Sequence, residues 1–482
     1  MAVKEEQQFV KEIPSKTGSF SEWYTSVVLK GELADYAPIR GCMVIRPYGF
    51  AIWENIQQGL DRRFKATGHR NAYFPLFIPE SLLKKEAEHV EGFAPQVAWV
   101  TRGGTEDLTE KLVVRPTSEA IICSMYAKWI RSYRDLPVLV NQWCNVVRWE
   151  KSTRLFLRTT EFLWQEGHTA HRTEAEAEEE TLRMLNIYRD FAENDLAIPV
   201  IWGLKTEGEK FAGAVNTYSI EALMPDGQAL QAGTSHFLGQ NFARAFDIKF
   251  LDSDNLEKFV WQTSWGVSTR IMGALIMTHG DDRGLFFPPR IAPLQVVIVP
   301  IVYEKRKEEI LGKAAQLRDL LASRFRVELD SREEYTPGWK YNEWEMRGVP
   351  LRLEIGQRDL DQGQVILAPR DGSGKAPVKE ADLLERIQSM LDGIQQAMLS
   401  KARKFLGDHT HSASSLSEFV GQVRDRRGFY RVDWCGSSQC EEKIGKETGT
   451  TARCISTEEK PDGNCLACGG EASRVVYFAR AY

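Results

Sequence analysis

Residues 145–168 read NVVRWEKSTRLFLRTTEFLWQEGH, and this stretch decides the fold. Its pattern predicts a strand, a charged turn and a second strand. Side chains two apart on a strand share a face, so Arg148 and Glu150 would project together, as would every second residue from Phe162 to His168. Guanidinium groups pair with phosphate oxygens, and a carboxylate accepts from an adenine amino group, so the pattern suits a bound nucleotide. Taken alone the signal is weak, because Arg-x-Glu on a strand is usually a solvated cross-strand pair.

The same stretch resembles motif 2 of the class II aminoacyl-tRNA synthetases. Its residues are similar to those of prolyl-tRNA synthetases of the archaeal/eukaryotic type. The resemblance runs from about residue 18 to Tyr482. It implies an α+β catalytic domain on an antiparallel sheet over 18–288. An α/β anticodon-binding domain over 289–405 and a small α/β zinc-binding C-terminal domain over 406–482 would follow.

The composition is that of a multidomain cytoplasmic protein. A length of 482 residues with 43% hydrophobic side chains allows about two to four domains with sizeable cores. The longest apolar run, 296–302, is too short to span a bilayer, and the N-terminus lacks the apolar segment of a secretion signal, so we expect no membrane association. Residues 1–17 are polar and charged, and we expect them to be disordered. The net charge of −5 neither requires nor excludes a nucleic acid, so contact with tRNA has to use local basic surface.

Eight cysteines are unevenly distributed, and five of them lie near the C-terminus. Cys435 and Cys440 form one closely spaced pair, and Cys465 and Cys468 form another. Two such pairs in a cytosolic chain indicate one structural Zn²⁺ held by four thiolates. Cys454 lies in a strand-like run, and we expect it to be a non-ligand. Disulfides among the five cysteines are the alternative, which a reducing compartment disfavours.

A helix and a strand are predicted before the opening stretch. Apolar residues recur every three or four positions over 50–64, Gly68 ends the helix, and an apolar strand follows over 72–78. On its own the pair indicates core packing. Motif 1 of the class II family lies here, with Pro75 as its proline. Since motif 1 builds the dimer interface in that family, the resemblance implies a homodimer.

Two further segments match the amino-acid site of the family. Residues 117–119 read TSE at a predicted helix start, a sequence that fits a capping segment equally well. Residues 233–236 read GTSH, where a lone histidine is more often a hydrogen-bonded core residue than a functional one. The resemblance instead implies a functional role for His236. It also implies that Trp164 and Phe211 contact the pyrrolidine ring of bound proline. The residues that it assigns to proline are Thr117, Glu119, Arg148, Trp164, Glu166, His168 and His236.

Residues 265–277, WGVSTRIMGALIM, predict an apolar helix opened by a glycine and an arginine, similar to motif 3. Backbone N–H groups and an arginine at a helix start suit a phosphate, although glycine-led helix starts are common. The resemblance implies that Arg148 and Arg270 are the catalytic residues and that Mg²⁺ accompanies ATP, with Gln231 assigned to the metal. The residues that it assigns to ATP are Arg148, Glu150, Arg158, Thr159, Gln231, Thr234, Ser268 and Arg270.

A βαβ unit is predicted from an apolar strand over 294–299, an amphipathic helix over 305–325 and a strand over 326–329. It carries no glycine-rich phosphate loop, so we expect no nucleotide hydrolysis there. In the family this domain binds the anticodon. The candidate contacts are Lys340, Arg347 and Arg352, with ordinary charged surface as the alternative for each.

The function that the resemblance implies is ATP-dependent activation of L-proline to prolyl-adenylate and transfer to the 3′ end of tRNA(Pro). Motif 2 and motif 3 are separated only by residues 167–269. This segment is too short to contain the internal editing domain of bacterial-type relatives. The alternatives are another class II synthetase, such as the threonyl enzyme, and a non-catalytic tRNA-binding paralogue. Arg148 and Arg270 argue against the paralogue, because binding alone needs no phosphate arginines. The resembling enzymes lay their terminal tyrosine, here Tyr482, back toward the catalytic domain.

Overall fold

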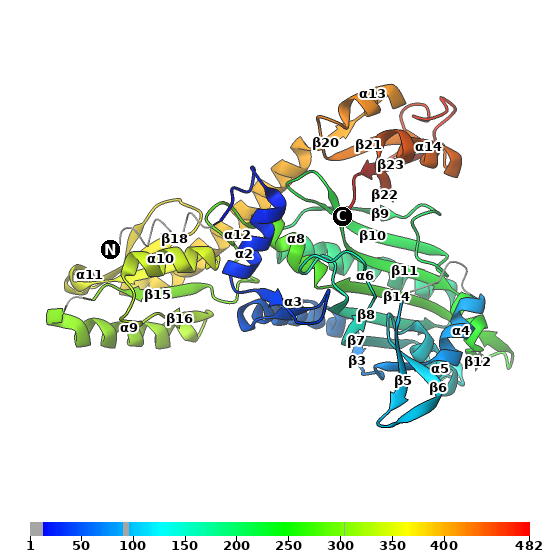
Figure 1. The fold of residues 1–482 in the computed structure, drawn as a ribbon, viewed down its shortest axis with the longest axis horizontal. Coiled ribbons are helices and arrows are strands. Elements are labelled where there is room, and N and C mark those ends of the chain that lie inside the picture. The colour runs from blue at the N-terminus through cyan, green and yellow to red at the C-terminus, as the bar shows by residue number, and fades with distance from the viewer. Residues whose placement is uncertain (1–12, 90–95, 303) are drawn as a thin grey trace.

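The structure is a computed structural model that describes residues 13–89, 96–302 and 304–482. Its central feature is an 11-stranded sheet in the order β20-β21-β23-β22-β9-β10-β11-β14-β8-β7-β3 (Figure 1). All neighbours in it are antiparallel except the outermost pairs, β20 with β21 and β3 with β7, so the predicted antiparallel class is confirmed. The strands are β3 (Arg70–Asn71), β7 (Val138–Val147), β8 (Glu161–His171), β9 (Val200–Leu204), β10 (Asn216–Leu223), β11 (Ala229–Gly239), β14 (Trp261–Ser268), β20 (Thr410–Ser412), β21 (Phe429–Trp434), β22 (Thr451–Ile455) and β23 (Arg474–Ala479).

Helices cover one face of this sheet. The long helix α6 packs on β10, β11 and β14, and α3 packs on α6. The start of α6 carries a capping box. The Thr173 side chain accepts a hydrogen bond from the backbone N–H of Glu176, and the Glu176 carboxylate accepts one from the backbone N–H of Thr173. The helices of this part are α2 (Phe20–Lys30), α3 (Pro47–Ala66), α4 (Glu80–His89), α5 (Glu119–Trp129), η1 (Tyr133–Asp135), α6 (Glu174–Asn194), α7 (Asn241–Phe246) and α8 (Arg270–His279).

Three small sheets flank the large one. The expected strand over 72–78 is wrong in its extent, because only Phe77–Pro79 (β4) is a strand there, after the two-residue β3. Pro75 has no N–H for a ladder, and the neighbouring Phe74 N–H donates instead to the side chain of Gln142. The remaining strands are β1 (Ala34–Tyr36) with β2 (Met43–Ile45), β5 (Ala98–Gly103) and β6 (Glu106–Val114) with β4, and β12 (Lys249–Leu251) with β13 (Glu257–Phe259).

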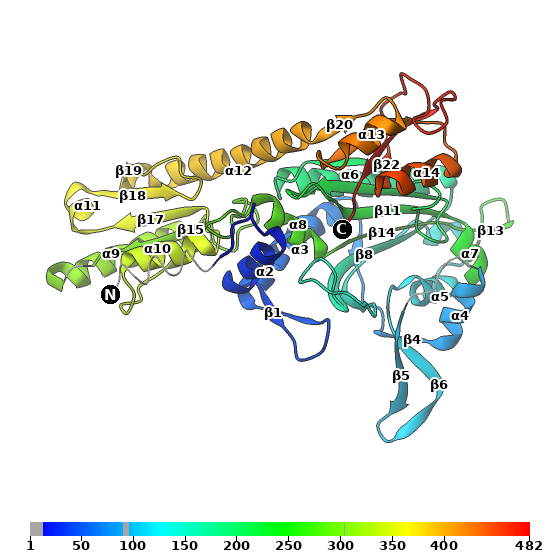
Figure 2. The same cartoon turned by 45° about the horizontal axis from the view of Figure 1, so that its top comes forward.

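The α/β unit at the left of Figure 1 contains a five-stranded sheet in the order β16-β15-β17-β18-β19. β15 and β16 are parallel and joined through α9, as the predicted βαβ unit requires. Figure 2 shows α12 running from this unit to the C-terminal one, past the expected boundary at 405. The elements are β15 (Val296–Pro300), η2 (Glu304–Arg306), α9 (Lys307–Ala322), β16 (Val327–Leu329), α10 (Pro337–Met346), β17 (Leu351–Ile355), α11 (Gln357–Gln362), β18 (Gln364–Pro369), β19 (Ala376–Lys379), η3 (Glu380–Asp382) and α12 (Leu383–Asp408).

The C-terminal unit adds α13 (Leu416–Gln422) and α14 (Ser438–Thr448) to strands β20 to β23. Its strands extend the catalytic sheet, because Ile455 of β22 pairs with Leu204 of β9. The pairing covers what would otherwise be an exposed strand edge.

The expected disorder over 1–17 stays a prediction, since residues 1–12 lie outside the described part. Within the described residues 13–17, Lys16 donates to the carbonyls of Met277 (2.8 Å) and Gly280 (2.5 Å) at the end of α8. Among the described helices, none combines the length and apolar character needed to cross a bilayer.

Candidate active site

A cavity of about 530 Å³ opens on the sheet face opposite to α6. The register of β8, β14 and β11 places His168 beside Ser264 and Ser264 beside His236, and all three line the cavity. Ser235, next in sequence to His236, faces the helix layer and donates a 2.7 Å hydrogen bond to the carbonyl of Thr181 in α6. The period-two alternation of the strands therefore separates the polar cavity wall from the core.

The adjacent row across the same strands has a gap in its middle. Glu166 of β8 lies beside Gly266 of β14, which lies beside Thr234 of β11. A Cβ atom at Gly266 would come within 3.1 Å of the backbone oxygen of Gln165 and would project into the row. The missing side chain thus leaves space between Glu166 and Thr234 for a bound molecule.

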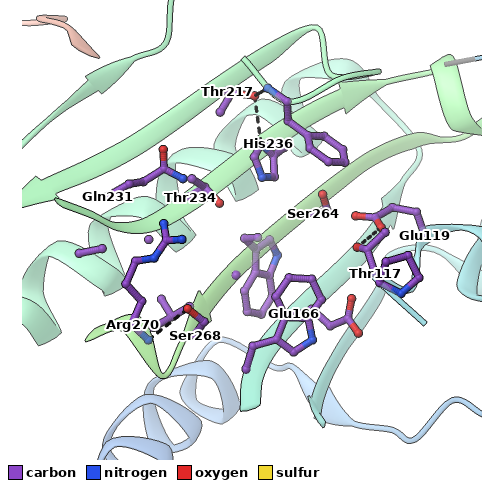
Figure 3. A pocket seen from close by; sticks show the side chains of 18 of the residues that line it. Thr117, Glu119, Glu166, Thr217, Gln231, Thr234, His236, Ser264, Ser268 and Arg270 are labelled. Atoms are coloured by element: carbon purple, nitrogen blue, oxygen red, sulfur yellow. Dashed lines mark hydrogen bonds between the residues drawn. The ribbon is translucent and has the colours of Figure 1, made fainter. Parts of the chain in front are cut away.

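The start of α5 and the loop before it bring two predicted residues into the cavity. The Thr117 hydroxyl donates to the Glu119 carboxylate, and both side chains are buried and line the cavity. Ser118 makes no capping bond to α5 and donates instead to Glu166. The segment therefore points inward, and helix capping does not explain it. Figure 3 shows Thr117, Glu119 and Glu166 toward one end of the cavity.

Glu166 and His168 form a buried pair, with Glu166 Oε2 at 3.1 Å from His168 Nε2. Burial would raise the pKa of Glu166, but hydrogen bonds from His168, Ser118 and Gln142 lower it below the ordinary value. Burial would lower the pKa of His168, but Glu166 and the nearby Glu119 raise it. Each partner therefore favours the charged form of the other.

His236 is held in a different state. Its Nδ1 lies 3.0 Å from Thr217 Oγ1, and its ring packs on Phe211 with the centroids 4.7 Å apart. Burial, with a contribution from His168, lowers the pKa of His236 to about 3, so the ring is neutral. The sequence did not single out Thr217 because its place opposite His236 follows only from the pairing of β10 with β11.

Arg148 enters the cavity from just beyond a strand. The expectation that Arg148 and Glu150 share a strand face is wrong, because β7 ends at Val147 and both residues lie in the following loop. Arg148 Nε donates to the carbonyl of Pro116 at 3.0 Å, and its guanidinium lies 5.2 Å from the Trp164 ring centroid. These contacts orient the side chain of Arg148, which lines the cavity.

Arg270 is the first residue of α8. Figure 3 shows it with Gln231, Thr234 and Ser268, away from the end of the cavity that holds Glu119 and Glu166. Its Nε donates to the carbonyl of Leu157 at 3.1 Å, and its backbone N–H donates to Ser268 Oγ at 3.3 Å. Burial, followed by the like charges of Arg148 and Arg158, lowers the pKa of Arg270. A site that gathers like-charged arginines in this way favours an anionic ligand.

Three residues assigned to ATP do not line the cavity: Glu150, Arg158 and Thr159. Arg158 Nε donates to Glu150 Oε2 at 2.7 Å, and the Thr159 hydroxyl donates to the carbonyl of Glu161, also at 2.7 Å. These three side chains thus form their hydrogen bonds within the loop between β7 and β8 and the start of β8. The other predicted site residues of the catalytic domain all line the cavity.

The three candidate anticodon residues are engaged within the chain. Lys340 is buried and donates to the carbonyl of Asp330 at 3.1 Å. Arg347 and Arg352 form ion pairs with glutamates at 2.5 and 2.9 Å.

The same unit also carries an aromatic stack. The rings of Tyr335 and Trp339 are 3.8 Å apart and nearly parallel, and the Arg332 guanidinium lies 5.0 Å from the Tyr335 ring centroid. Stacked aromatic rings beside an arginine suit unstacked RNA bases. Sequence reasoning missed this face, although the run of aromatic residues over 335–344 was a usable signal.

Four cysteine sulfurs of the C-terminal unit lie within 4.8 Å of one another: those of Cys435, Cys440, Cys465 and Cys468. The Cys435 and Cys440 sulfurs are 3.6 Å apart, and those of Cys468 and Cys435 are 3.9 Å apart. Tetrahedral Zn²⁺ with bonds of about 2.3 Å requires sulfurs roughly 3.8 Å apart, so the donor set fits the metal. Cys454 is buried in β22, outside this group.

Tyr482 lies against the catalytic sheet. Its hydroxyl donates to Asp226 at 2.7 Å, and its backbone N–H donates to the carbonyl of Ala229 at 3.1 Å. The guanidinium of Arg154, from the loop between β7 and β8, lies 5.8 Å from the Tyr482 ring centroid. Tyr482 thus contacts both strand β11 and the loop between β7 and β8.

Comparison with known proteins agrees with this geometry. Residues 99–279 match the tRNA synthetase class II core domain (G, H, P, S and T), residues 295–390 match the anticodon binding domain, and residues 416–482 match the prolyl-tRNA synthetase C-terminal family. The chain is 60% identical to the proline–tRNA ligase of Natranaerobius thermophilus over 99% of its own length and 100% of that relative. It is 58% identical to the ligase of Alkaliphilus oremlandii over the same shares, and 55% identical to that of Clostridium novyi over 100% of both chains.

Proposed function

The chain belongs to the class II prolyl-tRNA synthetases, and from this premise we propose how its cavity carries out the proline–tRNA ligase reaction. In that reaction the carboxylate of L-proline attacks the α-phosphate of ATP, and pyrophosphate leaves. The prolyl group of the adenylate then passes to a ribose hydroxyl at the 3′ end of tRNA(Pro), releasing AMP. The observation that carries the proposal is one cavity lined both by two arginines, Arg148 and Arg270, and by the buried carboxylates of Glu119 and Glu166.

Activation needs alignment and charge compensation. The attacking carboxylate is already ionised, so no general base is required. We assign Arg148 to the substrate carboxylate and α-phosphate, and Arg270 to the phosphates. Because each has its Nε fixed by a backbone carbonyl, the terminal guanidinium nitrogens are preorganised for charge that develops on the phosphoryl oxygens.

The acidic end is the proposed proline subsite. A secondary ammonium has two N–H donors and a positive charge, so it needs acceptors, and Thr117 with Glu119 supplies them. Ser264 strengthens the assignment, because its buried hydroxyl has no hydrogen-bond partner among the described residues. Trp164 and Phe211 line the cavity as ring walls, and the neutral His236 closes the polar end without repelling the ammonium.

The adenosine side of ATP is assigned to the gap at Gly266 and to Gln231, Thr234 and Ser268. Glu150, Arg158 and Thr159 belong to the same proposed set, and their engagement requires the Glu150–Arg158 pair to open when ATP binds. Class II synthetases use Mg²⁺ with ATP, and the metal offsets phosphate charge when bound. Gln231, with a neutral amide oxygen in the cavity, is the side chain we assign to it.

Outside the cavity, we propose that the four clustered cysteines hold one structural Zn²⁺ with no open coordination position. The domains proposed are 18–288 for catalysis, 289–405 for the anticodon and 406–482 for zinc binding. For the anticodon, the aromatic stack of Tyr335 and Trp339 is a better candidate than the predicted Lys340, because the Lys340 ammonium is buried.

A homodimer through motif 1 is also proposed. Val44, Phe50, Tyr73 and Phe77 are large apolar side chains of that region that lie exposed, and a second copy would cover them. Light scattering on the purified chain tests this assembly.

We further propose the archaeal/eukaryotic subtype and action in the cytosol. The described residues between motifs 2 and 3 are occupied by α6, α7 and strands β9 to β14 of the catalytic unit. We therefore expect mischarged alanyl-tRNA to persist in the presence of this chain alone. Efficient hydrolysis of that species by the pure protein would count against the subtype.

The test of the function is amino-acid-dependent pyrophosphate exchange with proline, alanine, cysteine and threonine side by side. We expect proline to be activated best. Alanine is smaller and enters the site, with discrimination of only about 1 to 3 kcal/mol per missing methylene. Threonine activated better than proline would favour the threonyl alternative, and exchange with none of them would favour the non-catalytic one.

A further inference from the structure

A buried ion cluster joins the C-terminal unit to the catalytic sheet. Glu221 of β10 is fully buried, and its Oε1 accepts from Lys205 Nζ at 2.8 Å. Its Oε2 accepts from Arg453 of β22, from Nη2 at 2.9 Å and from Nε at 3.1 Å. Lys205 Nζ also donates to the backbone carbonyl of Arg453 at 2.7 Å. One carboxylate thus faces two cations, and one of them comes from the C-terminal unit.

The cluster lies beside the phosphate side of the cavity. Glu221 pairs across the ladder with Gln231 of β11, which lines the cavity. The register of β10 and β11 shifts between Ile220 and Glu221, where Ala232 of β11 has no partner on β10, the pattern of a β-bulge. Bulges re-aim side chains, and this one lies next to Gln231 and opposite Glu221.

Glu221 also acts electrostatically on Arg270. Arg148 and Arg158 disfavour the positive charge on Arg270, and Glu221 is among the carboxylates that favour it. Burial alone would raise the pKa of Glu221, yet Lys205 and Arg453 hold it below its ordinary value. The cations of the cluster therefore keep a fixed negative charge near Arg270.

Arg453 is essential to this arrangement because a carboxylate without exposed surface needs partners for both oxygens. Ser219 and Lys205 bond to Oε1 of Glu221, and the contacts to Oε2 come from Arg453. Removing Arg453 would leave that oxygen buried without a donor, and the side chain and the bulge would relax.

We propose that Arg453 and Glu221 are positioning residues for ATP: Arg453 holds Glu221 at the bulge, and Glu221 in turn fixes Gln231 and Arg270. The C-terminal unit thereby completes the phosphate side of the catalytic cavity. This inference rests on the proposed function for its kinetic consequence. Neither residue touches ATP, so their substitution changes the use of ATP through the residues that they hold.

The experiment compares Arg453→Met and Arg453→Lys in the full-length chain by proline-dependent pyrophosphate exchange, with ATP and proline varied separately. Arg474→Met is the matched control, because Arg474 is an exposed arginine of the same unit. We expect Arg453→Met to lower kcat/KM for ATP at least about tenfold, since small misplacements of catalytic groups are costly, and to change KM for proline less than about twofold. Arg453→Lys should recover part of the loss, and Arg474→Met should match the wild type.

A double-mutant cycle that combines Arg453→Met with Glu221→Gln separates a positioning role of Arg453 from a general effect on stability. In that background Arg453→Met should have little further effect on kcat/KM for ATP, because Arg453 acts through Glu221. Arg453→Met with unchanged ATP kinetics, or with ATP and proline affected equally, would overturn the inference. Zinc content is measured for each variant, and a loss of ATP use confined to zinc-depleted protein would equally refute it.

Two further measurements keep the test decisive. If Arg453→Met does not fold, Arg453→Lys carries the comparison, because lysine keeps the charge but cannot make both bonds to Oε2. If the wild type shows no proline-dependent exchange, the proposed function fails. Calorimetric titration of the same variants with ATP then decides the inference independently, with weaker binding expected for both Arg453 variants than for Arg474→Met.

Discussion

Replacing Arg270 by alanine should abolish most of the activation step without unfolding the protein. Arg270 has its Nε bound to the carbonyl of Leu157, so its remaining guanidinium nitrogens are available to phosphate oxygens. Loss of one preorganised donor to a developing oxyanion costs about 3 kcal/mol, which corresponds to roughly a 150-fold fall in kcat. The apo protein should tolerate the change, because burial and the like charges of Arg148 and Arg158 oppose the charge on Arg270.

The assay is proline-dependent pyrophosphate exchange with saturating ATP and proline, beside a thermal melt without ligands. Arg244→Ala is the control, since Arg244 is an exposed arginine on α7. We expect exchange by Arg270→Ala to fall about 150-fold at an unchanged or higher melting temperature. Exchange within threefold of the wild type would refute the assignment, and a collapse of the melting temperature would show that Arg270 is structural instead.

Three other outcomes follow from the site. Glu119→Ala should raise KM for proline about tenfold or more, through loss of a charge-assisted hydrogen bond, and an unchanged KM would remove Glu119 from the proline subsite. Cys465→Ser combined with Cys468→Ser should eliminate zinc measured by metal analysis and loosen the C-terminal unit to proteolysis, whereas full zinc retention would exclude these ligands. His168→Gln should destabilise the protein most below about pH 6.5, because a raised folded pKa contributes stability that is complete there and disappears as the pH rises through that pKa. Unfolding free energies that differ equally at pH 6 and pH 9 would contradict the charged state of His168.

Much of the cavity wall was predictable because strand periodicity is a local property. In the second strand of residues 145–168, alternation placed Phe162, Trp164, Glu166 and His168 on one face. All four line the cavity. The failure at Arg148 is also local: the apolar run indicated a strand but contained no signal for where the ladder ends.

Other site residues depend on pairings between distant segments. Ser264 is a cavity residue because β14 lies between β8 and β11, and Thr217 is one because β10 pairs with β11. Neither order can be derived from local propensity, since the register is set by the packing of whole strands. Recognition of the family assigned roles to residues, but it did not reveal these neighbours.

The junction between the catalytic sheet and the C-terminal unit has a consequence for how the chain can be divided. The unit covers the edge of β9 with β22, and the backbone N–H of Ala229 donates to the carbonyl of Arg480 at 2.7 Å. Ending the chain at the proposed boundary of 405 would remove Arg453 from Glu221 and expose the edge of β9 together. A zinc site built only to stabilise an appendage would not require these contacts. The contacts instead make the fold of the C-terminal unit, and hence the zinc proposed for it, a condition for the geometry of the phosphate side of the cavity.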